Sequence, residues 1–136
     1  MNTLVIVFIL FFFTKLVYSQ EFLITGKVID ENFNSLAGVI ISNSKTQEYE
    51  TTNTKGNFEI KADIGDSLKF KFVGLAPEVI MVDSKREINL IMIDKTVNCL
   101  GGIYTKRDYK IAYRKIDKKQ KKLYKEANKL RIWDEK

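Results

Sequence analysis

Hydrophobic and polar residues alternate in short runs through the middle of this chain. From Phe22 onward the runs have a period of two, as in a β-strand with one buried face, and turn residues separate them. The pattern predicts seven strands, near residues 24–30, 38–42, 49–52, 58–61, 68–72, 79–82 and 87–93. Seven short strands in about 75 residues are typical of a sandwich of two sheets, so we expect an all-β fold.

The first residues follow a different pattern. Residues 4–13 are apolar without interruption, and Lys15 ends the run well short of the roughly 20 apolar residues that a membrane-spanning helix needs. Val17 and Ser19 stand where a signal peptidase that cuts before Gln20 prefers them. Residues 1–19 are therefore predicted to be a signal peptide, with an uncleaved anchor as the alternative. Export would place the protein in the periplasm, at the outer membrane or outside the cell.

The last residues form a third pattern. Residues 106–133 contain no glycine or proline and many lysines, which predicts a basic amphipathic helix after a linker at residues 96–105. Apolar side chains recur there at spacings of three and four, so the helix has one apolar stripe. The stripe consists of Tyr109, Tyr113, Ile116, Gln120, Leu123, Ala127 and Leu130, widened by Ala112 and Tyr124. Lysines four residues apart weaken such a helix in isolation, and we expect it to pack against a surface.

Three surfaces remain open for this helix. It can pack on its own sandwich, on a partner protein or second copy, or on an anionic membrane or glycan. The side chains expected to contact an anionic surface are Lys115, Lys118, Lys119, Lys121, Lys122 and Lys125. Nucleic acid is not expected as a partner, because the signal peptide directs the chain away from it.

Charge is divided unevenly between the predicted parts. Residues 20–105 carry 9 Lys and Arg against 12 Asp and Glu, whereas residues 106–136 carry 13 against 5. The net charge of +6 for the whole chain therefore describes neither a mildly acidic sandwich nor a strongly basic tail.

The residue types available for catalysis are few. The chain has no histidine and one cysteine, so the usual general base and the usual zinc ligands are missing, and we expect no cofactor or metal. Cys99 is expected to be a partly buried thiol, with pairing between chains as the alternative. The carboxylates of Asp63, Asp66, Asp83 and Glu87 lie near predicted turns and are expected to be solvated.

Several short motifs occur in an order and spacing that one family shares. They are Gly26, Val28 and Asp30; Leu36, Gly38, Val39 and Ile41; Thr52, Gly56 and Phe58; and Gly65, Asp66, Leu68, Phe70 and Gly74. Through them, residues 24–90 resemble the carboxypeptidase-regulatory-like domain, a transthyretin-like, Ig-like sandwich of seven strands. Such domains lie beside the catalytic domain of some metallocarboxypeptidases and at the N-termini of TonB-dependent receptors of the Bacteroidetes.

The resemblance implies an exported, non-enzymatic module that binds a protein or glycan of the cell envelope, with the end loops at residues 31–35 and 53–57 as candidate contacts. A small transthyretin-like hydrolase is one alternative. Its family motif Tyr-Arg-Gly-Ser is only half matched, by Tyr113 and Arg114, and no histidine is present. A remnant of a receptor gene is the other alternative, because the sequence holds no plug or barrel after the domain.

Overall fold

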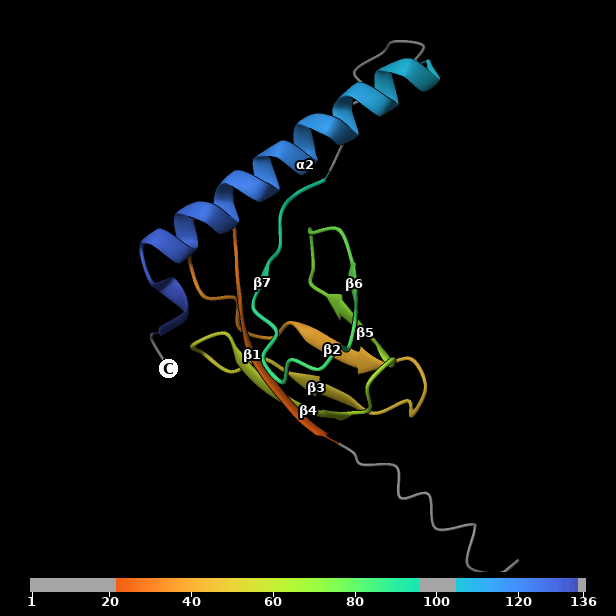
Figure 1. The fold of residues 1–136 in the computed structure, drawn as a ribbon, viewed down its shortest axis with the longest axis vertical. Helices are drawn as coiled ribbons and strands as arrows, with labels where there is room; N and C mark the ends of the chain where they lie inside the picture. Colours follow the sequence, from red (N-terminus) through yellow and green to blue (C-terminus); the bar gives the residue numbers. More distant parts are fainter. Residues whose placement is uncertain (1–21, 96–104, 135–136) are drawn as a thin grey trace, which may run out of the picture.

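The computed structural model, which describes residues 22–95 and 105–134, contains two small sheets with one long helix lying across one of them (Figure 1). The strands are β1 (Phe22–Ile29), β2 (Ile40–Asn43), β3 (Tyr49–Thr51), β4 (Asn57–Ala62), β5 (Ser67–Lys71), β6 (Glu78–Met81) and β7 (Leu90–Ile91). The helix is α2 (Lys106–Lys129), and a short 3₁₀ turn, η1 (Ile132–Asp134), follows it. The prediction of seven strands in two sheets with a C-terminal helix is confirmed. The predicted signal peptide and Cys99 lie outside the described residues.

The strands divide into a three-stranded and a four-stranded sheet. Their orders are β4-β1-β7 and β3-β2-β5-β6. All neighbours are antiparallel except β1 and β7, which run parallel. A parallel pair needs a crossover rather than a hairpin, and here the chain builds the whole second sheet between β1 and β7.

The core lies between the two sheets and follows the alternation in the sequence. In β4, Phe58 and Ile60 are buried while Glu59 and Lys61 face solvent. The rings of Phe58 and Phe70 meet edge to face across the core, with centroids 5.5 Å apart and planes at 76°. This geometry is favourable for aromatic pairs, so the contact helps to hold the two sheets together.

A buried carboxylate joins two turns at one end of the sandwich. Asp66 is only 5% exposed, and its Oδ2 accepts hydrogen bonds from Asn43 Nδ2 at 2.8 Å and from the backbone N–H of Asp63 at 3.0 Å. Lys45 Nζ lies 3.4 Å from Asp66 Oδ1 and 3.3 Å from Asp63 Oδ2. The prediction that Asp66 is solvated is therefore wrong, because the side chain folds back under its own turn to bind Asn43.

Asp66→Asn is expected to remove part of the acid sensitivity of this protein. Burial opposes ionisation, but the bonds from Asn43 and the Asp63 backbone, with Lys45 nearby, hold the pKa of Asp66 below its ordinary value of 3.8. The ionised carboxylate thus stabilises the fold above pH 3.8, and this contribution is lost as the pH falls through the lower folded-state pKa. The variant should lose about 1–2 kcal/mol of unfolding free energy at neutral pH and less in acid.

Urea unfolding at neutral pH and at about pH 3 measures the difference. Asp83→Asn is the matched control, because Asp83 is exposed and its one hydrogen bond among the described residues comes from the Lys85 backbone N–H, at 2.7 Å. An Asp66→Asn variant that loses as much stability in acid as in neutral solution contradicts the assignment.

Helix α2 begins at a capping box. The Thr105 side chain accepts a hydrogen bond from the Asp108 backbone N–H at 3.3 Å, and the Thr105 N–H donates to Asp108 Oδ2 at 2.8 Å. Hydrogen bonds from Thr105 hold the pKa of Asp108 below its ordinary value. Thr105, predicted to be the last linker residue, therefore fixes the first turn of the helix.

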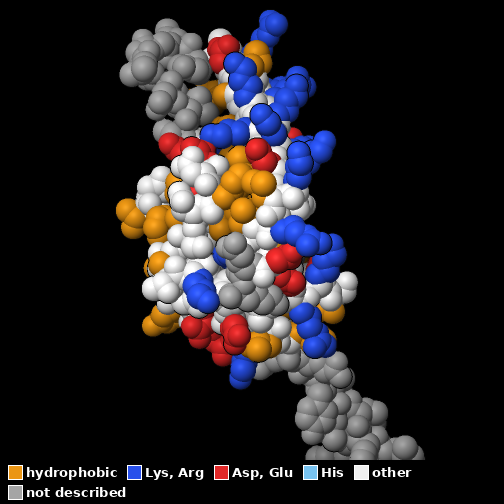
Figure 2. Space-filling model, turned by 90° about the vertical axis from the view of Figure 1, so that its left-hand side faces the viewer, with side chains coloured by type: hydrophobic (Ala, Val, Ile, Leu, Met, Phe, Trp, Pro, Cys, Tyr) orange, Lys and Arg blue, Asp and Glu red, His pale blue; other side chains and the backbone are white. Residues whose placement is uncertain are grey.

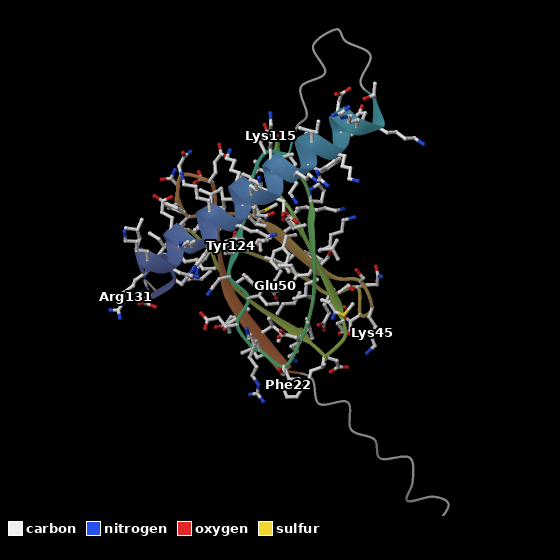
Figure 3. All side chains as sticks on the ribbon, turned by 45° about the horizontal axis from the view of Figure 1, so that its top comes forward. Phe22, Lys45, Glu50, Lys115, Tyr124 and Arg131 are labelled. Carbon is white, nitrogen blue, oxygen red and sulfur yellow. The ribbon has the colours of Figure 1, made fainter. Side chains whose placement is uncertain are left out.

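The C-terminal half of α2 packs on the outer face of the three-stranded sheet (Figure 3). Ala127 is fully buried, and a small cluster surrounds it. The cluster consists of Ile29, Ile91, Ile93 and Ala127, with Phe33, Ile116, Leu123, Tyr124, Ile132 and Trp133 partly buried against it. Tyr124 Oη accepts a hydrogen bond from the Ile91 backbone N–H at 3.1 Å. Of the three surfaces considered for the helix, its own sandwich is the one that this half occupies.

The helix ends earlier than predicted. Leu130 is its C-cap, and Arg131 adopts a left-handed conformation with φ 55°, so the chain turns back toward the sheet before residue 133. Lys27 Nζ then donates to the carbonyl of Ile132 at 3.3 Å, and Trp133 Nε1 donates to Asn128 Oδ1 at 2.8 Å. This reversal places Trp133 beside the sheet rather than on the helix surface.

Candidate functional site

A groove beside the 3₁₀ turn η1 is lined by strands of both sheets and by loop residues. Its volume is about 570 Å³. Its floor and walls are Thr25, Gly26, Lys27, Glu50, Thr51, Asn53, Asn57, Phe58, Glu59, Glu87, Asn89 and Trp133. The lining contains three carboxylates, from Glu50, Glu59 and Glu87, and one ammonium, from Lys27. The groove is therefore acidic.

Several parts of the chain bring the groove together, and strand β3 of the other sheet contributes Glu50 and Thr51. Thr25, Lys27 and Glu59 are the outward residues of β1 and β4, which pair directly. Glu87 joins them because its segment bridges to Thr25 in parallel, and Trp133 joins them through the reversal after α2. These contacts are distant in sequence, and only the folded chain creates the groove.

The turn at residues 53–57 forms one wall of the groove. Asn53 Oδ1 accepts hydrogen bonds from the backbone N–H groups of Lys55 at 2.9 Å and Asn57 at 3.0 Å. Gly56 has φ 76°, and a Cβ there would lie 2.4 Å from the carbonyl oxygen of Val28. The glycine is therefore needed for both its conformation and its closeness to β1. This predicted end loop does border a cavity.

The other predicted end loop, at residues 31–35, has a different role. Asp30 Oδ1 accepts from the backbone N–H groups of Asn32 and Asn34, at 2.8 and 2.9 Å, which shapes the loop. Phe33 then packs into the cluster under α2, and Glu31 forms an ion pair with Lys119. This loop supports the helix instead of forming an open binding surface.

A row of cations follows the solvent side of α2. We call this row the basic ridge; it consists of Arg107, Arg114, Lys118, Lys122, Lys125 and Lys129, all exposed. The ridge residues are spaced by three, four and seven, and they lie on the side opposite to Ala127. Figure 2 shows several groups of Lys and Arg side chains over the upper part of the molecule, with fewer Asp and Glu side chains between them.

The six lysines predicted from the sequence divide between the ridge and other positions. Lys118, Lys122 and Lys125 belong to the ridge, and Lys115 lies next to it. Lys119 is paired with Glu31, and Lys121 Nζ lies 2.9 Å from Asp117 Oδ2. The structure therefore brings together four of the six on an open surface.

The N-terminal part of α2 extends beyond the sandwich (Figure 1). We call residues 106–115 the projecting segment. Tyr109 and Tyr113 belong to the same apolar stripe as Ala127. Ala127 is buried against the sandwich, whereas the two tyrosines are 42% and 59% exposed. The stripe thus continues past the surface that covers it.

The carboxylates proposed as turn residues are not arranged as a catalytic pair. Asp63 and Asp66 meet at the Lys45 end of the sandwich, whereas Glu87 lines the groove. Among residues 22–95 and 105–134, no group of three His, Cys, Asp or Glu is placed to hold a metal ion. In the same part of the chain, no helix has the length and apolar content to cross a bilayer.

Two small sheets around one core, with glycine turns at the strand ends, define the class of protein as a β-sandwich module. A sequence model of the CarboxypepD_reg-like domain matches residues 24–100, more than half of the chain, and the protein belongs to this family. The resemblance inferred from the short motifs is thereby confirmed. A comparison with curated proteins found no match.

Proposed function

We propose that this protein is an exported, non-enzymatic binding module of the cell envelope, built on a transthyretin-like sandwich. In this proposal the basic ridge of α2 binds an anionic surface of the envelope, formed by lipid headgroups. The family is a regulatory domain and not a catalytic one, which supports the absence of an enzymatic role.

The orientation of α2 carries the proposal. The sandwich covers the apolar side of the helix around Ala127, so the six ridge cations all face outward. Each lysine or arginine close to an anionic membrane surface contributes about 1 kcal/mol of binding free energy. A row of six along one helix is sufficient for peripheral binding.

The same orientation determines how the helix would bind. An interfacial helix inserts its apolar face between lipids, and here that face is occupied by Ile29, Ile91 and Ile93. We therefore expect electrostatic attachment that keeps the helix outside the acyl region. Such attachment is sensitive to salt, because ions screen exposed charges.

The half-matched hydrolase motif does not support the enzymatic alternative. Tyr113 and Arg114 are exposed on the projecting segment of α2, whereas the groove is lined by strands, loops and η1. No histidine is present in the chain to activate a water molecule.

Co-sedimentation of the purified protein with vesicles, with and without anionic lipid, tests the proposal. The triple variant Lys118→Glu/Lys122→Glu/Lys125→Glu should weaken binding to anionic vesicles by about 100-fold or more. The control is Lys61→Glu/Lys71→Glu/Lys85→Glu, which changes the net charge equally at exposed sites of the sandwich. Equal losses in both variants, or no binding of the unaltered protein to anionic vesicles, would contradict the proposal.

A further inference from the structure

We propose that the protein forms a dimer in which the projecting segment of α2 of each copy binds in the acidic groove of the other. The proposal uses surfaces that the basic ridge does not include. Three observations carry it: an apolar stripe whose two tyrosines near the start of the helix are exposed, cations beside that stripe, and an acidic groove.

The first observation is the continuation of the stripe. Tyr109 and Tyr113 precede Ile116 at spacings of four and three, so all three lie on one side of the helix. Ile116 is partly buried against the sandwich, but the two tyrosines are 42% and 59% exposed. Two adjacent aromatic side chains that extend a buried stripe mark a surface for a further partner.

The second observation is the charge that flanks the tyrosines. Lys106 and Lys110 precede Tyr113 by seven and three positions, so they lie along the same side of the projecting segment. Both are exposed, and neither makes an ion pair within the described residues. The partner of this surface must therefore offer carboxylates as well as room for the rings.

The third observation is the groove itself. Glu50, Glu59 and Glu87 supply three exposed carboxylates in its lining. The single ammonium there, Lys27, is 7% exposed and donates to the Ile132 carbonyl, so it lies below the surface. Trp133 adds an aromatic wall on which a tyrosine or an ammonium can rest. A volume of about 570 Å³ admits several side chains of a helix but not a whole helix.

A two-fold arrangement satisfies both contacts at once. The groove lies beside the C-terminal end of α2, since Trp133 lines it, and the projecting segment is the opposite end of the same helix. Two copies with antiparallel α2 helices therefore bring each projecting segment to the other copy's groove. An exchange of this kind closes on itself and stops at the dimer.

Two variants, each with the charge reversed on one of the two contacting surfaces, test the proposal. The helix variant is Lys106→Glu/Lys110→Glu, and the groove variant is Glu59→Lys/Glu87→Lys. In sedimentation velocity at low ionic strength, about 0.05 M, we expect the unaltered protein to dimerise and each variant alone to remain monomeric. An equimolar mixture of the two variants should dimerise again, because both contacts then join opposite charges. Raising the ionic strength to about 0.5 M should weaken both dimers.

The controls separate this surface from others. Lys118→Glu/Lys122→Glu changes the ridge by the same charge and should leave dimerisation intact, so the dimer and the proposed membrane binding can fail independently. A monomeric unaltered protein would overturn the proposal. So would a dimer that persists in both variants, or a mixture that stays monomeric although each variant has a native circular dichroism spectrum. Binding of the monomer to an acidic peptide instead would assign the projecting segment to another protein.

Discussion

Replacement of Gly26 by alanine is expected to lower the free energy of unfolding by about 3 kcal/mol or more. Gly26 lies in β1 where the segment before β7 crosses it. A Cβ at this position would lie 1.8 Å from the carbonyl oxygen of Ile88 and 2.8 Å from the Phe58 ring. The neighbouring backbone must shift to admit even one methyl group, and that backbone is held by bonds from Thr25 N–H to Arg86 and from Ile88 N–H to Thr25. Glycine inside a strand marks such a close approach.

Thermal and urea unfolding of Gly26→Ala measure the effect, and Gly38→Ala is the matched control. Gly38 has φ 80°, but no atom lies within 4 Å of a Cβ built there. Its replacement adds backbone strain of about 1–2 kcal/mol without a clash. If the two variants lose equal stability, the close approach at Ile88 does not limit the fold.

The same crossing explains why the strand predicted over residues 87–93 is longer than the one in the structure. The alternation predicted a continuous strand over residues 87–93, but β7 is only Leu90–Ile91. Glu87 bridges to Thr25, and the ladder resumes at Leu90 opposite Val28. Period-two alternation reports which side chains are buried, and Ile88 is partly buried on the core side. It does not report whether the backbone stays in register with its neighbour.

For other elements, the local pattern of hydrophobic and polar residues was sufficient to predict the structure. Strand β4 was predicted from Phe58 and Ile60 alternating with charges, and the stripe on α2 was predicted from its spacing. These features depend on residues close together in sequence, so the chain itself determines them. The family resemblance likewise followed from local turn and strand motifs.

The candidate site depends on long-range contacts that no local pattern contains. The sequence pattern predicts Glu87 to be a solvated turn carboxylate and Trp133 to end a helix, and neither prediction places them beside Glu59. These side chains come together because of the crossover to β7 and the left-handed turn at Arg131. Arginine seldom adopts a left-handed conformation, so the sequence does not predict this turn. The stripe did not indicate how far the sandwich would cover it either, because that depends on where the folded helix meets the sheet.

Replacement of Ala127 by glutamate is expected to detach α2 and unfold most of its 24 residues. Ala127 is fully buried against Ile29, Ile91 and Ile93, and a carboxylate there would lose its hydration without gaining a partner. Detachment also removes the contact between Tyr124 and the Ile91 N–H. The free helix carries a net charge of about +8, and isolated helices with like charges four apart are marginal in water.

Far-ultraviolet circular dichroism should show the loss of helix, while hydrogen exchange should show that the core strands stay protected, because their main cluster lies between the sheets. Ala112→Glu provides the control, since Ala112 lies on the same stripe in the projecting segment, away from the buried cluster. The control should keep the helix signal. If Ala127→Glu keeps it too, the helix forms without the sandwich, and both the outward orientation of the basic ridge and the placement of Trp133 lose their structural basis.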